Sequence, residues 1–339
     1  MSCSVDAKSQ LTQFEQLPNE LMLDIFSRIK IEYLHDAFWG LNLRFNVLFQ
    51  STKRLSFKFH DYIKDQRIKL YGSFVNELVI DTFKSCDLQL FPNVKKLTIL
   101  NTDSNDLNKI NPEILPSLTH LTISLGSTFT APTQLIEDIF SNKFPSIEYA
   151  NLGQLARYDS YLWLIVPSLR FISVGLTRVH VMSDILMTCP NLNHLQLHIL
   201  ETTQTDSIPT SPITYPLRRL TIWSDTRQLT LNTINSYLSI VPNVQHLYLQ
   251  TVYKASLVKL ADNLIHKLKD LSRFDCHIKT NTFIDDTDDI LNSLSQVHTC
   301  FTRIKCIEQD EEEKQYRFFF VQINLFRDKN KPRLILIKI

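Results

Sequence analysis

Glycine is scarce in this chain of 339 residues: there are 5, about 1.5% of the sequence where roughly 7% is usual. The five are scattered, so no two of them could shape the same loop. P-loop, dinucleotide-binding and kinase motifs all need clustered glycines, because the backbone must approach the phosphates closely. The sequence therefore excludes most nucleotide chemistry.

The six cysteines include no Cys-x-x-Cys pair, and the closest two, Cys300 and Cys306, are six residues apart. Structural zinc sites usually bring two ligands within a few residues of each other, and secreted disulfide scaffolds are shorter and richer in cysteine. His194 and His198 share a predicted strand but lie about 13 Å apart there, too far to chelate one ion. We therefore expect reduced cysteines, no metal site and no cofactor.

Long apolar runs are also missing: no stretch reaches the roughly 18 residues of a membrane-spanning helix, and the N-terminal residues lack the apolar segment of a secretory signal. The net charge is +1, so no strong overall field attracts the chain to nucleic acid or to an anionic membrane. The 44% hydrophobic content is enough for a large core. We expect an intracellular protein, cytoplasmic or nuclear, that binds neither nucleic acid nor membrane.

A short pattern recurs through most of the chain: a proline, then Asn or Ser, then three apolar residues spaced as Leu-x-x-Leu-x-Leu. Clear copies begin at Pro92, Pro116, Pro145, Pro167, Pro190 and Pro242, and weaker copies start their apolar triads at Val75, Leu217, Leu271 and Phe301. The first apolar residues are 19 to 30 positions apart, with a mean near 25. This period and this spacing are typical of leucine-rich repeats.

Each repeat combines two kinds of apolar periodicity. The last two apolar residues of a triad alternate with polar ones, which indicates a strand with one buried face. Helical spacing follows between triads, for example over residues 257–268. Such an alternation could also form a doubly wound sheet. The regular period and the missing glycine loops favour an α/β solenoid of leucine-rich-repeat type, with one strand and one helix per repeat.

Residues 12–51 do not follow the repeat and indicate three short helices. The segment Leu17-Pro18-Asn19-Glu20-Leu21 begins the first helix, since proline suits the first turn and an acidic residue suits the positive end of the helix dipole. Ile25-Phe26-Ser27-Arg28-Ile29 continues this helix, and the pair Arg44-Phe45 lies in the third. These motifs at this spacing resemble an F-box, with Phe45 where that family usually has tryptophan. The whole chain resembles an F-box protein with C-terminal degenerate leucine-rich repeats.

The resemblance implies an adaptor role. F-box proteins bind a Skp-type adaptor and through it a cullin, and their second domain captures a protein substrate that other subunits ubiquitinate. The chain would then be a non-catalytic substrate-recognition subunit, with adaptor contacts among Leu17, Pro18, Leu21, Ile25, Phe26, Leu34 and Phe45. Several of these residues could instead form the core of the three helices. The alternative function is a binding scaffold that acts outside a cullin complex.

The strand residues that alternate with the buried anchors would line the concave face of the solenoid. Tyrosine, tryptophan and arginine dominate the energetics of protein interfaces. We expect the substrate to bind where such residues gather on neighbouring repeats, at Arg219, Trp223, His246, Tyr248 and Arg273. A modest excess of positive charge there favours an acidic or phosphorylated partner segment. An ordinary solvated β-face with scattered aromatic residues is the alternative.

These patterns divide the chain into five parts. We expect a disordered N-terminus over residues 1–11, the F-box over 12–51, an N-terminal capping unit over 52–73, about ten degenerate repeats over 74–307, and an acidic loop with a β-hairpin cap over 308–339. Within the last part, the acidic run 308–313 suits a solvated loop. The β-rich stretches 316–325 and 333–339 would form the hairpin.

Overall fold

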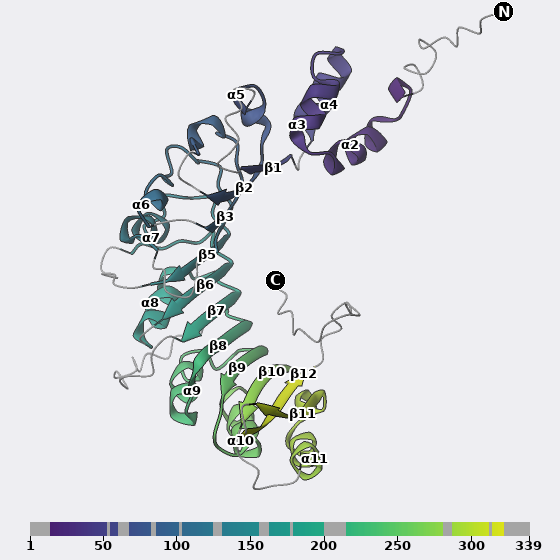
Figure 1. Ribbon diagram of the computed structural model, residues 1–339. Helices are drawn as coiled ribbons and strands as arrows, with labels where there is room; N and C mark the ends of the chain where they lie inside the picture. The colour runs from purple at the N-terminus through teal and green to yellow at the C-terminus, as the bar shows by residue number, and fades with distance from the viewer. Residues whose placement is uncertain are drawn as a thin grey trace, which may run out of the picture. The chain divides into compact units, whose positions relative to one another are not determined.

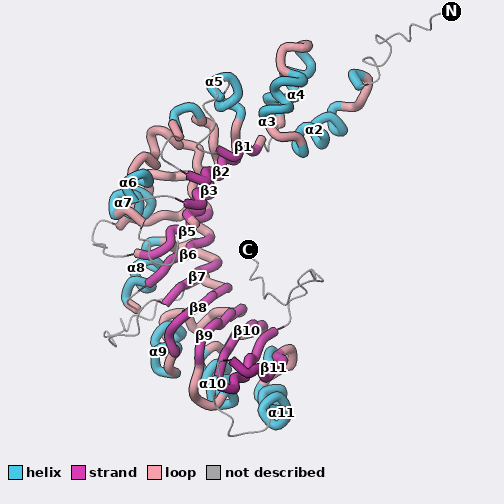
Figure 2. The backbone as a smooth tube through the Cα atoms, in the orientation of Figure 1, coloured by secondary structure: helices cyan, strands magenta, loops and turns pink. Residues whose placement is uncertain are grey.

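The structure is a computed structural model of the chain. It describes residues 14–52, 55–59, 68–82, 86–101, 104–124, 131–155, 163–176, 179–199, 215–280, 287–311 and 314–321, so the expected disordered segment 1–11 lies outside the described residues. The chain divides into two compact units, Met1–Ile222 and Trp223–Ile339. Figure 1 labels the elements, and Figure 2 shows strands alternating with helices and loops in each unit. No helix in the described part of the chain has the length and hydropathy needed to cross a bilayer.

The first unit contains a parallel sheet whose strands follow the order of the chain. Its strands are β1 (Ser56–Phe59), β2 (Glu77–Thr82), β3 (Lys96–Asn101), β4 (His120–Ile123), β5 (Tyr149–Gln154), β6 (Phe171–Leu176), β7 (His194–Ile199) and the first residues of β8 (Arg219–Gln228). The described helices between these strands lie on one side of the sheet (Figure 1). The described elements between the strands are α5 (Ile68–Tyr71), η1 (Gly72–Phe74), η2 (Leu88–Leu90), α6 (Ser104–Leu107), α7 (Thr133–Phe140) and α8 (His180–Thr188). We call the other side of the strands, in either unit, the open face.

The proline turns set the start of each strand. Pro116 is exposed in a turn that is closed by the N–H of Leu118 donating to the carbonyl of Leu115 at 3.2 Å. The next N–H, from Thr119, donates to Lys95 of the preceding repeat at 2.8 Å and so fixes the register of β4 against β3. Leu121 is then buried while its neighbour His120 is half-buried on the open face, as strand periodicity requires. The buried anchors of successive repeats stack into one core.

The second unit continues the repeat and ends in a hairpin. It contains the remainder of β8, β9 (His246–Val252), β10 (Arg273–Thr280), β11 (Ile304–Glu311) and β12 (Lys314–Val321), with α9 (Leu231–Leu238), α10 (Leu257–Lys267), α11 (Thr287–Val297) and η4 (Thr299–Phe301). The helices begin at side-chain caps: Thr230 accepts from the N–H of Thr233, and Ser256 from that of Lys259. Strands β9 and β10 are parallel, whereas β12 is antiparallel to both β10 and β11.

The predicted succession of one strand per repeat, stacked as in a leucine-rich-repeat arrangement, is confirmed. The predicted helix in each repeat is not found in every segment that the structure describes. The outer segments are less regular than expected, since the one between β2 and β3 contains the 3₁₀ turn η2 and the one between β3 and β4 only the four-residue helix α6. The strand expected from the tenth triad is β11, and β12 separates it from β10. The parallel series therefore ends one strand earlier than the triads indicate.

The prediction of an acidic loop over residues 308–313 was wrong for most of that run. Much of the acidic run lies in strand β11 rather than in a loop, and the predicted hairpin strand that starts at Tyr316 pairs with β11. The backbone register places Glu308 opposite Arg317 and Glu311 opposite Lys314. The other predicted hairpin strand, 333–339, lies outside the described residues.

Candidate functional site

Three helices form a small module at the N-terminus, over residues 14–52, which we call the N-terminal module. They are α2 (Asn19–Arg28), α3 (Ile31–Phe38) and α4 (Leu43–Ser51), and all three agree with the expected helices. Its core is aromatic: the ring of Phe38 lies 4.9 Å from that of Phe26 and 5.5 Å from that of Phe45. Asn42 caps α4 by accepting from the N–H of Phe45 at 2.9 Å, which directs the Phe45 side chain into this core.

Arg44 joins the start of α4 to the start of α2. Its guanidinium donates to the carbonyl oxygens of Glu15 and Leu17, and its Nε donates to Oδ1 of Asn19 at 3.0 Å. These bonds hold the Leu-Pro-x-Glu-Leu segment beside the first turn of α4, where Leu43 lies. Arg44 was part of the sequence motif but was not among the predicted contacts. Its position just before a buried aromatic residue at a helix start is the signal that could have marked it.

The N-terminal module leaves an unusual amount of apolar surface in water. Five of the ten large apolar side chains that the described residues leave exposed belong to it, namely Leu21, Tyr33, Leu41, Leu43 and Val47. Leu43 is 79% exposed, and Val47 lies one helical turn further along the same face of α4. Exposed apolar surface gathered in one small module is typical of a site that another protein covers.

The predicted adaptor contacts separate into two groups. Phe26, Leu34 and Phe45 are buried in the module, so in this structure they are core residues. Leu17 and Ile25 are half-buried, whereas Pro18 and Leu21 are exposed. Sequence reasoning missed the exposed residues of α4, because the apolar pattern of a nine-residue helix does not show which face its neighbours cover.

An aromatic cluster seats the N-terminal module on the first repeat. The ring of Phe74, in η1, lies 5.0 Å from that of Trp39 and 5.0 Å from that of Phe49. The ring of His35 in α3 lies 5.7 Å from the ring of Tyr71 in α5. The module is therefore packed against the repeat array rather than joined to it by a free linker.

A row of rings runs along the open face of the first unit. His120, Tyr149, Phe171 and His194 hold paired positions on β4 to β7. The rings of Tyr149 and Phe171 stack at 4.1 Å with 2° between their planes, and His194 packs edge-on against Phe171. Burial, with the charge of Lys96 adding to it, lowers the pKa of His120, and burial raises the pKa of Tyr149. Both rings are therefore uncharged at neutral pH, and the row is a polar–aromatic surface of the kind that binds proteins.

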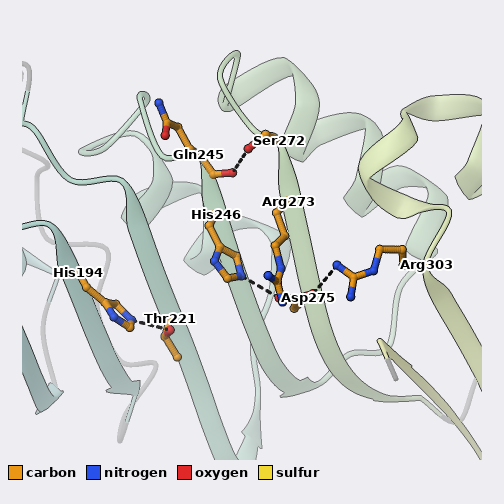
Figure 3. Close-up of polar contacts among 8 residues, drawn as sticks. All are labelled: His194, Thr221, Gln245, His246, Ser272, Arg273, Asp275 and Arg303. Carbon is orange, nitrogen blue, oxygen red and sulfur yellow. Dashed lines mark hydrogen bonds and ion pairs between the residues drawn. The ribbon is translucent and has the colours of Figure 1, made fainter. Parts of the chain in front are cut away.

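The open face of the second unit carries a charged cluster instead (Figure 3). Asp275 is only 3% exposed, and its Oδ2 accepts from Nε2 of His246 at 2.8 Å and from Nε of Arg273 at 2.6 Å. Nη1 of Arg303 lies 3.9 Å from the other oxygen, Oδ1. Burial alone would raise the pKa of Asp275, but the hydrogen bonds from His246 and Arg273 outweigh it and hold the pKa below its ordinary value.

The five predicted substrate-binding residues do not form one set. His246 and Arg273 meet on Asp275, which was not among the predicted residues. Tyr248 is half-buried beside them, its hydroxyl donates to Gln250 at 3.2 Å, and burial raises its pKa to about 12. Arg219 belongs to the first unit and is exposed, while the half-buried Trp223 begins the second.

Asp275→Asn is expected to lower the free energy of unfolding at pH 7 by about 1–3 kcal/mol, because an amide holds the two basic groups less strongly than a buried carboxylate does. A carboxyl whose pKa is lowered by folding stabilises the protein above its unfolded pKa, near 3.9, and loses that contribution as the pH falls through the folded value. The difference between the two proteins should therefore shrink below about pH 4. Urea unfolding across this range measures it, with Asp262→Asn on the exposed side of α10 as control. A difference that did not change with pH would contradict the assignment.

Comparisons with known proteins add little. No protein-family model matches the chain, and no curated protein matches it either. Among solved structures, the chain is similar to the leucine-rich repeat-containing protein LegL7 from Legionella pneumophila, at 13% identity over 71% of this chain and 97% of that chain, with a TM-score of 0.39. A likeness at that TM-score supports no statement about function.

Proposed function

We propose that this chain is a non-catalytic substrate-recognition subunit of a Skp–cullin–F-box ubiquitin ligase. Its N-terminal module would bind the Skp-type adaptor, and the open face of its repeats would bind a protein substrate. The observation that carries the proposal is the apolar surface of the N-terminal module. Leu21, the last residue of the Leu-Pro-x-Glu-Leu segment, is exposed there, and so is Leu43 beside that segment.

The energetics of a small module support a partner at this surface. Covering apolar surface is worth roughly 25 cal/mol per Å², so a partner that covers several such side chains gains several kcal/mol. The core that remains is a small set of aromatic rings and a few aliphatic residues, which is marginal for a domain of this size. A bound adaptor would therefore stabilise the module as well as recruit it.

The substrate half of the proposal depends on the open face. Its ring row in the first unit and its charged cluster in the second offer aromatic and arginine side chains, the types that contribute most to protein interfaces. A scaffold that binds an adaptor outside a cullin complex would use the same two surfaces. Co-purification distinguishes these functions, since a cullin retained with the adaptor supports the ligase and its absence supports the scaffold.

Leu21→Glu combined with Leu43→Glu is expected to weaken binding of a purified Skp-type adaptor by about 100-fold or more, because two apolar contacts near the centre of the interface are lost. Both side chains are more than half exposed, so the variant should keep the circular-dichroism spectrum of the parent. Leu164→Glu with Ile165→Glu is the matched control, since it adds the same charge at exposed apolar positions outside the module. Equal adaptor affinity for both variants would refute the proposed adaptor site.

A further inference from the structure

The Asp275 cluster is a built arrangement rather than a chance set of surface charges. Phe274 and Cys276 are buried in the core, so Arg273 and Asp275 belong to the open face of β10. Asp275 is nevertheless almost fully buried, because basic side chains from three elements lie over it: His246 from β9, Arg273 from β10 and Arg303 from the turn before β11. One carboxylate thus binds a guanidinium group and an imidazole by hydrogen bonds, and it forms a longer ion pair with a second guanidinium (Figure 3).

Both arginines contact Asp275 and still have N–H donors that a ligand could bind. Among the described residues, Asp275 is the polar partner of Arg273 and engages its Nε–H, which is one of the five N–H donors of a guanidinium. The 3.9 Å separation from Arg303 is an ion pair that is too long for a hydrogen bond. Their side chains are 46% and 51% exposed, so both guanidinium groups reach solvent.

The cluster also keeps an excess of positive charge. Arg273 and Arg303 together carry two positive charges against the single negative charge of Asp275. A guanidinium binds a carboxylate through two parallel hydrogen bonds, and this pairing is stronger when the guanidinium is already held in place. The half-buried ring of Tyr248 lies in register with Asp275 and adds an apolar flank.

We propose that Arg273 and Arg303 form a carboxylate-binding site that receives an acidic segment, rich in aspartate and glutamate, of the protein that the open face binds. Asp275 and His246 are positioning residues that fix Arg273. The inference rests on the substrate half of the proposed function and adds the chemistry of the partner. It is independent of adaptor binding by the N-terminal module.

An acidic peptide fits these observations better than RNA does. Binding to a phosphate backbone depends on many lysines and arginines along a groove, whereas this chain has a net charge of +1 and the cluster offers two arginines. Binding to single-stranded RNA also needs exposed rings on which bases stack. Tyr248 is half-buried and its hydroxyl is hydrogen-bonded to Gln250, so it does not offer an open ring face of that kind.

The experiment selects displayed random peptides on the full chain and then measures their affinities by fluorescence anisotropy. We expect the recovered peptides to be enriched in aspartate and glutamate, and Arg273→Gln with Arg303→Gln to weaken their binding by about tenfold or more. Lys259→Gln with Lys267→Gln, which removes the same charge from the exposed side of α10, should leave the affinity unchanged. Since Arg273→Gln also removes a partner of Asp275, the single variant Arg303→Gln provides a test in which the shorter bonds are intact, and it should weaken binding as well.

Four results would overturn the inference. Recovered peptides without acidic enrichment would leave the proposed function intact but exclude the carboxylate site. Acidic peptides bound equally well by the parent and by both arginine variants would place their site elsewhere. Labelled oligouridine bound with dependence on both arginines, in the absence of acidic-peptide binding, would assign the cluster to RNA. Failure to recover any peptide would count against the substrate half of the proposed function as well.

Discussion

Phe26→Ala is expected to unfold the N-terminal module and to abolish adaptor binding with it. Phe26 is 0% exposed and its ring packs on Phe38 and Phe45, so truncation should cost about 3–5 kcal/mol, as it does for buried phenylalanines generally. A three-helix core of this size has little stability in reserve. Hydrogen–deuterium exchange of the amides in α2 to α4 measures the unfolding directly, and the amides of β3 to β7 serve as the internal reference.

The matched control is the surface variant Leu21→Glu with Leu43→Glu, in which adaptor binding should be lost while the module amides stay protected. Both variants should therefore lose adaptor binding, but only Phe26→Ala should lose amide protection. This difference distinguishes core residues from contact residues. If Phe26→Ala kept its amide protection and still lost the adaptor, Phe26 would be a contact, as the sequence motif had suggested. Protection and binding both retained would contradict its place in the core.

The repeat units could be predicted from the sequence because their determinants are local. A proline turn, an apolar triad and strand alternation all lie within about eight residues, and the first anchors Val94, Leu118 and Leu192 are buried as that pattern requires. The three N-terminal helices were found for the same reason, since a start signal such as Pro18 and an apolar stripe are read within a few turns.

The C-terminal pairing could not be read in this way. Strand β12 lies between β10 and β11. The strands of two consecutive repeats are therefore separated by a strand that comes later in the chain. Pairing of this kind depends on contacts between residues far apart in the chain, such as Cys276, whose Sγ is 3.6 Å from the carbonyl oxygen of Phe319. No local pattern near the triad at Phe301 indicates it.

The sequence indicated which residues lie on the open face but not which of them contact one another. The sequence placed His246 and Arg273 on the open face, and the structure pairs them in register. The sequence could not show that both side chains bind Asp275, because those bonds depend on side-chain conformations. It likewise showed Tyr149 and Phe171 at equivalent positions without showing that their rings stack. The register of these strands was therefore predictable from the triads, while the contacts between side chains depend on their conformations.

Register itself can be tested on β7, where Leu195→Ala is expected to lower the free energy of unfolding by about 2–5 kcal/mol. Leu195 is fully buried and lies in register with Ile172 of β6, so its truncation leaves a cavity in the core. The destabilisation exceeds the transfer free energy of the methyl groups that are removed, because the close-packed neighbours relax only in part and leave a cavity. Urea unfolding followed by circular dichroism measures the difference from the parent.

His194→Ala, one residue earlier on the same strand, is the matched control and should cost about 1 kcal/mol or less. The His194 ring lies on the open face, where it packs edge-on against Phe171 at 4.8 Å and its Nε2 is 3.2 Å from Oγ1 of Thr221. Those contacts are half-exposed, so water can replace most of the interactions that are lost when the side chain is removed. Because adjacent strand residues point to opposite faces, a register shift of one residue would exchange the two costs. Equal or reversed costs would therefore show that the open face has been assigned to the wrong side of the sheet.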